Sequence, residues 1–171
     1  MNQLIEELPT EIGSKVSKIS ESLSTTANEV RGISYQMMPI TLQEHGLVKA
    51  LEELLQRNLT ARSISFDFDH FESSIRLNKS IETSVYRITQ ELINNVVKHS
   101  GANHISVILQ LKNNFLSLIF EDNGKGFDYN STQKGIGLNS LNSRIEMAEG
   151  TIQIDSSENA GTTAFIRIPI K

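Results

Sequence analysis

Residues 91–100 read ELINNVVKHS, and this stretch decides how the rest of the chain is interpreted. Side chains three or four residues apart lie on the same side of an α-helix. A helix here therefore has a carboxylate, an amide and an ammonium in one row, at Glu91, Asn95 and Lys98. Such a row can hold a hydrated metal ion and a polyphosphate. The alternative is a buried helix with three structural polar residues.

A glycine-rich segment, DNGKGF at residues 122–127, follows an apolar run. Asp122 ends that run at the rim of a core, where an unpaired charge is costly, so it needs a hydrogen-bond donor. The exocyclic amine of adenine is one such donor, and Gly124 and Gly126 would let a base or a backbone approach closely. The alternative for this motif alone is a β-turn, because Asp-Asn-Gly is a favourable turn sequence.

Two further segments point the same way. Residues 135–138 precede a predicted helix, which suggests that backbone amides and a helix N-terminus face a phosphate. The candidate residues are Gly135, Ile136, Gly137 and Leu138. In residues 161–163, Thr162 and Thr163 have hydroxyls that could bridge to the base through water. Each segment alone resembles a turn, but all four in this order predict a nucleotide site.

The composition is that of a soluble globular protein and excludes several kinds of site. The chain has 171 residues, of which 38% are hydrophobic and 21% charged, and its net charge is -4. It has no cluster of Lys and Arg, which argues against nucleic-acid binding. The lack of cysteine excludes disulfides and thiolate metal sites. No apolar run reaches the roughly 18 residues of a membrane span, so we expect no membrane contact here and a cytoplasmic location, with any anchor elsewhere.

From Ile12 to Met37, apolar or small residues recur with alternating spacings of four and three. This heptad period is typical of a coiled coil or a helix bundle. The alternative is a helix that packs along its own domain. Pro39 ends the pattern, because its ring disfavours helix at the preceding residue. The predicted domains are residues 1–42, a bundle or dimerisation helix with its linker, and residues 43–171, a globular domain.

The remaining pattern predicts an α/β (α+β) two-layer sandwich, with a mixed sheet whose apolar face is covered by helices. Alternating apolar residues mark strands at 64–68, 105–111, 116–120, 151–155 and 163–170. Apolar residues at helical spacing mark helices at 46–59, 78–98 and 138–148. Asn113 and Asn114 predict a tight turn between two strands. Ile88, Leu92 and Val96 form a row that can face the core.

Together these segments resemble the catalytic, ATP-binding part of bacterial sensor histidine kinases, whose Bergerat-type (GHKL) fold is shared with gyrase, Hsp90 and MutL. The resemblance covers residues 64–170. Within it, residues 91–99 resemble the N box, 122–127 the first glycine box, 135–138 the second and 161–163 the final Gly-Thr element. The resemblance implies a protein histidine kinase of a two-component phosphorelay, with ATP and Mg²⁺ as cofactors.

The resemblance also implies a role for individual residues. Asn95 matches the N-box residue that binds magnesium, and Glu91 matches the acidic position implicated in catalysis. Lys98 matches a phosphate contact, and His99 matches the position beside the nucleotide. Asp122 matches the aspartate that specifies adenine.

Residues 33–39 and 42–47 resemble the end of the second dimerisation helix and its junction in the nitrate-sensor and desaturase-sensor subgroup. Those kinases have a short lid over ATP, and here residues 127–134 alone separate the glycine boxes. A phosphoacceptor motif, a histidine followed by an acidic residue, is not found on the heptad helix. The histidines are His45, His70, His99 and His104. We therefore expect the phosphoacceptor on an upstream helix absent from this chain, and we expect this chain not to phosphorylate itself.

The partners implied by the resemblance are ATP, the phosphoacceptor helix of the same kinase, a response regulator and, in the full-length protein, a second copy that forms a homodimer. Two other functions remain open. An ATP-gated binding module, such as an anti-sigma regulator or a pseudokinase scaffold, has the same fold but need not have a heptad helix leading into Met38 and Pro39. A conformational ATPase of the gyrase or Hsp90 kind is disfavoured by the short lid and the missing transducer domain.

Overall fold

The computed structural model describes residues 39–127 and 136–170. The chain divides into two compact units, Met1–Met38 and Pro39–Lys171, and all described residues belong to the second. The predicted heptad helix therefore lies outside the described residues. The second unit begins at Pro39, and Leu42 is fully buried in its core.

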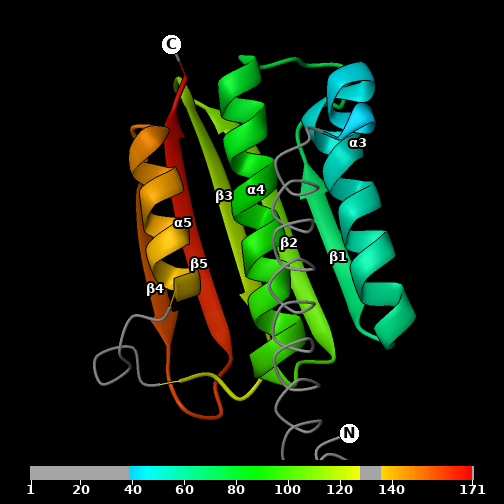
Figure 1. Cartoon of the computed structure of the whole chain (residues 1–171), viewed down its shortest axis with the longest axis vertical. Helices are drawn as coiled ribbons and strands as arrows, with labels where there is room; N and C mark the ends of the chain where they lie inside the picture. The colour runs from blue at the N-terminus through cyan, green and yellow to red at the C-terminus, as the bar shows by residue number, and fades with distance from the viewer. Residues whose placement is uncertain (1–38, 128–135, 171) are drawn as a thin grey trace, which may run out of the picture. The chain divides into compact units, whose positions relative to one another are not determined.

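The strands of the described residues form one five-stranded sheet in the order β1-β2-β3-β5-β4. β1 is parallel to β2, whereas β2–β3, β3–β5 and β4–β5 are antiparallel, so the sheet is mixed, as predicted. The elements, in chain order and with the labels of Figure 1, are α3 (Ile40–Leu59), η1 (Thr60–Arg62), β1 (Ser65–His70), α4 (Lys79–Asn95), η2 (Val96–Ser100), β2 (His104–Lys112), β3 (Phe115–Asp122), α5 (Ile136–Met147), β4 (Thr151–Ser156) and β5 (Thr162–Pro169).

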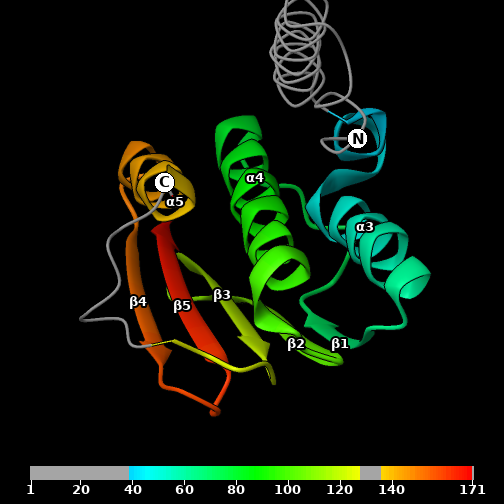
Figure 2. The same cartoon turned by 60° about the horizontal axis from the view of Figure 1, so that its bottom comes forward.

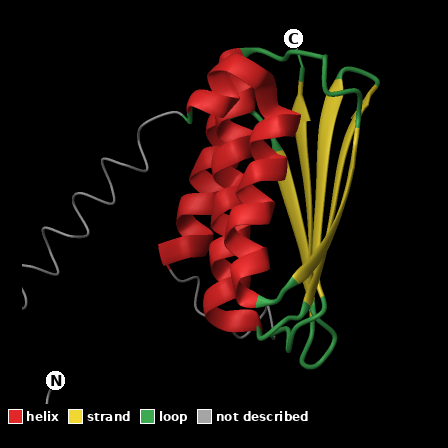
Figure 3. Ribbon diagram, turned by 90° about the vertical axis from the view of Figure 1, so that its right-hand side faces the viewer, coloured by secondary structure: helices red, strands yellow, loops and turns green. Residues whose placement is uncertain are grey.

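The helices of the second unit lie together on one face of the sheet (Figure 3). α3 lies over β1, α4 over the middle strands and α5 over β4 and β5 (Figures 1 and 2). Side chains that point toward the helices are buried, as at Val107, Leu109 and Leu118, and their neighbours along each strand are more exposed. Successive side chains of a strand point to opposite faces, which explains the alternation in the sequence. The predicted two-layer sandwich is confirmed.

The predicted strands are confirmed with small shifts at their ends. Asn113 and Asn114 both have positive φ, 51° and 60°, which is the type I′ turn expected for a tight hairpin between β2 and β3. Phe66 and Phe68 of β1 are only half-buried. β1 has a neighbouring strand on one side only, so its apolar face is less covered than that of a central strand.

Two of the predicted helices are found close to their expected positions. α3 begins at Ile40, earlier than predicted, but it is broken at Gly46, whose φ of 84° and ψ of -179° are not helical. The part after the break is the predicted helix, with Leu47, Leu51 and Leu54 buried. α5 is the predicted helix before Gly150. Among the described residues, no helix combines the length and the apolar character needed to cross a membrane.

The helix that contains the opening stretch ends earlier than predicted. α4 starts where expected, because the side chain of Asn78 accepts the N–H of Ser80 at 2.9 Å and caps the first turn. Its apolar row is buried, as predicted: Ile88, Leu92 and Val96. The prediction of an α-helix up to Lys98 is wrong, because Val96–Ser100 form a wider π-helical turn. The hydroxyl of Ser100 donates to the carbonyl of Val96 at 3.1 Å and so stabilises this turn.

Candidate functional site

The predicted site segments meet at one end of the sheet. The end of η2, the loop after β3, the start of α5 and the β4–β5 turn lie at the lower end of Figure 1. The N–H of Lys125 in the loop after β3 donates to the carbonyl of Ser100 in η2 at 2.9 Å. The N–H of Asn159 in the β4–β5 turn donates to the carbonyl of Lys125 at 2.6 Å. Segments far apart in the sequence are therefore held side by side.

Asp122 is the last residue of β3 and lies between Ile105 of β2 and Thr162 of β5. Its side chain is buried, with 6% exposed. The carboxylate accepts the N–H of Gly124 at 2.8 Å, and the nearby hydroxyls of Thr162 and Ser100 also act to lower its pKa. Burial nevertheless raises the pKa of Asp122, because the desolvation of the charged form outweighs these hydrogen bonds. A buried acid with a perturbed pKa is typical of functional sites.

Glu91 and Asn95 lie one turn apart near the end of α4, and both are half-buried. Lys98 and His99 lie in η2 and are exposed. The predicted single row is therefore interrupted after Asn95, because the π-helical turn changes the spacing of side chains. Within residues 39–127 and 136–170, none of these four side chains makes a hydrogen bond or an ion pair. The amide of Asn95 and the carboxylate of Glu91 are thus available to a ligand.

The residues near Asn95 suit a magnesium ion that arrives with a phosphate. Mg²⁺ keeps several waters and is usually bound by one or two protein oxygens together with phosphate oxygens. Among the described residues, no group of three or more His, Cys, Asp or Glu side chains could hold a metal ion by itself. Asn95 offers one amide oxygen, and Glu91 offers a carboxylate one turn earlier. This donor set fits a nucleotide-bound Mg²⁺ better than a resident metal.

The threonines predicted for the site lie on opposite faces of the sheet. Thr162 pairs with Asp122 across β3 and β5, so both side chains point to the helix-covered face. Thr163 pairs with Glu121, and its side chain points to the other face. The structure therefore brings Thr162 to the buried carboxylate and does not bring Thr163 there.

The second glycine segment lies at the start of α5. Ile136, Gly137 and Leu138 are the first residues of this helix, whereas Gly135 lies outside the described residues. The start of α5 is at the same end of the sheet as the loop after β3 (Figure 1). The role of this helix N-terminus in binding a phosphate stays a prediction.

The site glycines lie where backbone segments touch. A Cβ on Gly124 would lie 2.6 Å from the carbonyl oxygen of Ser100. A Cβ on Gly161 would overlap the carbonyl oxygen of Asp122, and Gly161 has a φ of 75°, which side chains disfavour. Gly161 thus allows the β4–β5 turn to pack directly against the end of β3.

We expect Gly161→Ala to lower the free energy of unfolding by about 3 kcal/mol, from left-handed backbone strain together with the overlap at Asp122. Gly101→Ala is the matched control: its φ is 67°, but its Cβ would meet nothing within 4 Å. The control should therefore lose only the strain, about 1 kcal/mol. Urea unfolding of both variants measures the difference, and equal losses would contradict the close packing at Asp122.

Two residues that hold the site together were missed by the sequence analysis. The side-chain oxygen of Asn123 accepts the N–H groups of Asn103 and His104 at 3.1 and 3.0 Å, which ties the loop after β3 to the segment after η2. The hydroxyl of Ser156 accepts the N–H of Phe127 at 3.0 Å. Asn123 lies inside the motif predicted to be part of the nucleotide site, with a β-turn as the alternative, and its polar side chain is the one local signal of this role. Ser156 had no local signal, because its partner lies in a distant segment.

Comparison with family models matches residues 80–171 to the family described as histidine kinase-, DNA gyrase B-, and HSP90-like ATPase. This range is more than half of the chain and contains the glycine loops, β5 and all of α4 except its first residue. The chain belongs to this ATPase family. The domain is therefore of a type that binds ATP. The resemblance inferred from the four motifs is confirmed.

Sensor histidine kinases are among the curated relatives of this chain. LiaS of Bacillus subtilis is 32% identical over 91% of this chain and 43% of its own length. NreB of Staphylococcus carnosus, an oxygen sensor histidine kinase, is 32% identical over 90% of this chain and 45% of its own length. DegS of Brevibacillus brevis is 31% identical over 91% of this chain and 41% of its own length. The chain thus spans less than half the length of these relatives.

Solved histidine kinase structures have the same fold. The Acinetobacter baumannii histidine kinase AdeS aligns with a TM-score of 0.64 at 18% identity, over 99% of this chain and 91% of that chain. The catalytic domain of the histidine kinase ThkA aligns with a TM-score of 0.60 at 18% identity, over 72% of this chain and 92% of that chain. At this identity the likeness supports the fold alone, and it agrees with the mixed sheet described above.

Proposed function

We propose that this chain is the ATP-binding catalytic part of a two-component sensor histidine kinase. It transfers the γ-phosphoryl group of ATP to a histidine on an upstream helix, and the phosphoryl group then passes to a response regulator. One observation carries the proposal: the buried carboxylate of Asp122 lies at the same end of the fold as Glu91 and Asn95, whose side chains make no hydrogen bond or ion pair within the part of the chain that the structure describes. The similarity to LiaS over 91% of the chain supports a kinase over other members of the family.

Each residue has a separate role in this proposal. ATP supplies the phosphoryl group, and Mg²⁺ neutralises phosphate charge. The carboxylate of Asp122 accepts a hydrogen bond from the exocyclic amine of adenine, and the hydroxyl of Thr162 contacts the base through water. The side-chain oxygen of Asn95 would hold Mg²⁺, which would supply positive charge beside the phosphates, and Glu91 would orient or deprotonate the attacking imidazole of the phosphoacceptor histidine. Phosphoryl transfer depends mainly on positioning and charge neutralisation, so the protein needs no covalent nucleophile.

The remaining predicted residues serve the phosphates and the partners. Lys98 neutralises phosphate charge, and His99 lies beside the nucleotide. The backbone amides of residues 135–138 contact phosphate at the start of α5. Residues 1–42 belong to the dimerisation part of the kinase and residues 43–171 to its catalytic domain. The full-length protein is a homodimer in this proposal, and this part of it is cytoplasmic.

An ATP-gated binding module of the same fold is the second candidate. In that case the nucleotide would only control a partner, and no phosphoryl group would be transferred. The similarity to named sensor kinases over most of the chain favours the kinase.

A transfer assay tests the proposal. The chain is incubated with radioactive ATP and a separate helix peptide that contains a phosphoacceptor histidine, with and without Mg²⁺. We expect acid-labile label on the peptide only with Mg²⁺, and no label on the 171-residue chain itself. ATP binding without transfer would favour the binding module. Steady ATP hydrolysis without transfer would favour a conformational ATPase of the gyrase or Hsp90 kind.

We expect the affinity for ADP to rise with pH through the raised pKa of Asp122 and then to become constant. The adenine amine stabilises the ionised carboxylate, so protonation of Asp122 opposes binding. In the protein without nucleotide, the pH dependence of stability has the opposite sign. Because burial raises the pKa of Asp122 above its unfolded value, its contribution to the free energy of unfolding decreases as pH rises from the unfolded to the folded pKa. Calorimetric titrations with ADP at several pH values measure the first effect, and Asp122→Asn should remove this pH dependence.

A further inference from the structure

The break in α3 leaves backbone carbonyls that a side chain from another segment contacts. The residues before the break, 40–45, are called the junction segment here, because they follow directly from the first unit. A helix end has carbonyls without helical donors. The guanidinium of Arg76 donates to the carbonyls of Leu42 and Gln43 through long hydrogen bonds of 3.4 Å each. Its positive charge also suits the negative end of a helical segment.

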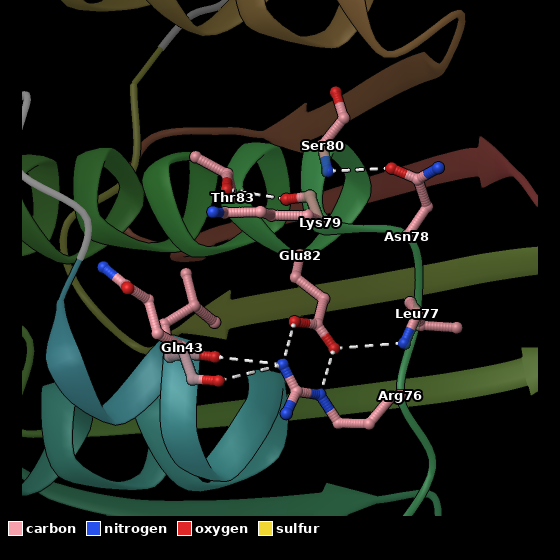
Figure 4. Close-up of polar contacts among 9 residues, drawn as sticks. Gln43, Arg76, Leu77, Asn78, Lys79, Ser80, Glu82 and Thr83 are labelled. Carbon is pink, nitrogen blue, oxygen red and sulfur yellow. Dashed lines mark hydrogen bonds and ion pairs between the residues drawn. The ribbon is translucent and has the colours of Figure 1, made fainter.

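The same guanidinium forms a bidentate ion pair with Glu82 in the first turn of α4 (Figure 4). Nε and one terminal nitrogen of Arg76 each lie 3.1 Å from an oxygen of Glu82. The N–H of Leu77 adds a third bond to this carboxylate at 3.0 Å. Glu82 is only 1% exposed, whereas the side chain of Arg76 is 47% exposed. The charge-assisted pair raises the pKa of Arg76.

Gly46 makes room for this arrangement. Its φ of 84° belongs to a region that side chains rarely adopt. A Cβ at this position would lie 3.0 Å from Cδ and 3.1 Å from Nε of Arg76. Any larger residue at position 46 would therefore strain the backbone and displace the guanidinium. We call Gly46, Arg76 and Glu82 the latch.

The junction segment has further anchors on the same unit. Leu42 is 0% exposed. The hydroxyl of Thr41 donates to the carboxylate of Glu53, beyond the break in α3, at 2.7 Å. A buried carboxylate is costly without its partner, so the loss of Arg76 should be strongly unfavourable for Glu82 in its present position. The loss of Glu82 instead removes the ion pair that holds the guanidinium of Arg76 beside the carbonyls of Leu42 and Gln43. Glu82 lies in the first turn of α4, whereas Glu91 and Asn95 lie toward the other end of the same helix.

We propose that Arg76 and Glu82 are positioning residues that fix the direction in which the chain enters the catalytic unit. Their relevance to catalysis rests on the proposed function, because a histidine upstream of Pro39 must reach the ATP site. In this proposal the ion pair between Arg76 and Glu82 and the hydrogen bonds of Arg76 to the junction segment hold residues 40–45 in one direction, so this segment does not act as a flexible linker. The latch does not touch the nucleotide, so the affinity for ATP should be independent of it.

Electron spin resonance distances test this proposal. The chain contains no cysteine, so spin labels can be placed at two new ones, Glu44→Cys on the junction segment and Gln153→Cys on β4, both at exposed positions. We expect one narrow distance distribution in the otherwise unchanged protein. Arg76→Met and Glu82→Gln should each broaden it or add a second population. Lys49→Met is the matched control, because it breaks an exposed ion pair with Glu52 on the same helix and should leave the distribution narrow.

Folding and function are checked separately. Arg76→Met should keep its affinity for ATP and its rate of transfer to a separate histidine peptide, for which the junction segment is not needed. Arg76→Lys keeps the charge but lacks the planar fork, so it should broaden the distribution less, and it replaces Arg76→Met if that variant does not fold. Unchanged, narrow distance distributions in the folded Arg76 and Glu82 variants would overturn the proposal that the latch fixes the junction segment. A lower rate with the separate peptide would overturn its purely positional role. Failure of transfer in the unsubstituted chain would remove the proposed function and leave the distances informative.

Discussion

Asp122→Ala should weaken the binding of ATP and ADP by roughly a thousandfold, because a site built to pair with an adenine amine loses the carboxylate that accepts its hydrogen bond. The substitution also leaves the N–H of Gly124 and the hydroxyl of Thr162 without the carboxylate that they contact in the free protein. Both effects act on the same end of the sheet. Isothermal titration calorimetry with ADP measures the affinity directly.

The neighbouring acid provides the control for this substitution. Glu121 is exposed and points to the opposite face of the sheet, so Glu121→Ala should leave the affinity for ADP unchanged. Asp122→Asn keeps the shape of the side chain and removes the buried charge. Because burial raises the pKa of Asp122, we expect the free Asp122→Asn protein to be at least as stable as the unsubstituted one at neutral pH. Equal ADP affinities in the Asp122→Ala and Glu121→Ala variants would contradict the role of Asp122.

Asn95→Ala should lower magnesium-dependent phosphoryl transfer by roughly a thousandfold, the size of effect seen when one group that stabilises transition-state charge is removed. The affinity for ADP without Mg²⁺ should change little, since Asp122 and the glycine loops remain. The rate of transfer to a histidine peptide, measured over a range of Mg²⁺ concentrations, separates the two effects.

Asn94→Ala is the matched control for Asn95. Asn94 has the same side chain and is also half-buried, but it points to a different side of α4, about 100° away. Its loss should leave the dependence on Mg²⁺ unchanged. If Asn94→Ala and Asn95→Ala had the same rate at saturating Mg²⁺, a metal ligand at Asn95 would be excluded.

The sheet and most helix positions follow from local patterns in the sequence. The alternation in residues 105–111 and 116–120 predicts the β2–β3 hairpin, because one face of each strand is buried. Ile88, Leu92 and Val96 predict the buried side of α4 for the same reason. Burial of apolar surface is a strong effect that repeats along an element, so periodicity detects it.

The departures occur where single side chains override the period. The π-helical turn after Asn95 depends on Ser100, and the early start of α3 depends on Leu42, Gly46 and Arg76. Arg76 acts on carbonyls more than thirty positions away in the sequence, so no local window contains both partners. The side on which Thr163 lies depends on the register between β3 and β5, which the sequence alone does not specify.

The most direct test of the account is a crystal structure of this chain with Mg²⁺ and a non-hydrolysable ATP analogue. We predict that the adenine amine donates to the carboxylate of Asp122 and that the side-chain oxygen of Asn95 lies in the coordination shell of Mg²⁺. A nucleotide bound elsewhere, or an adenine at Asp122 with its metal held away from Asn95, would contradict the proposed site.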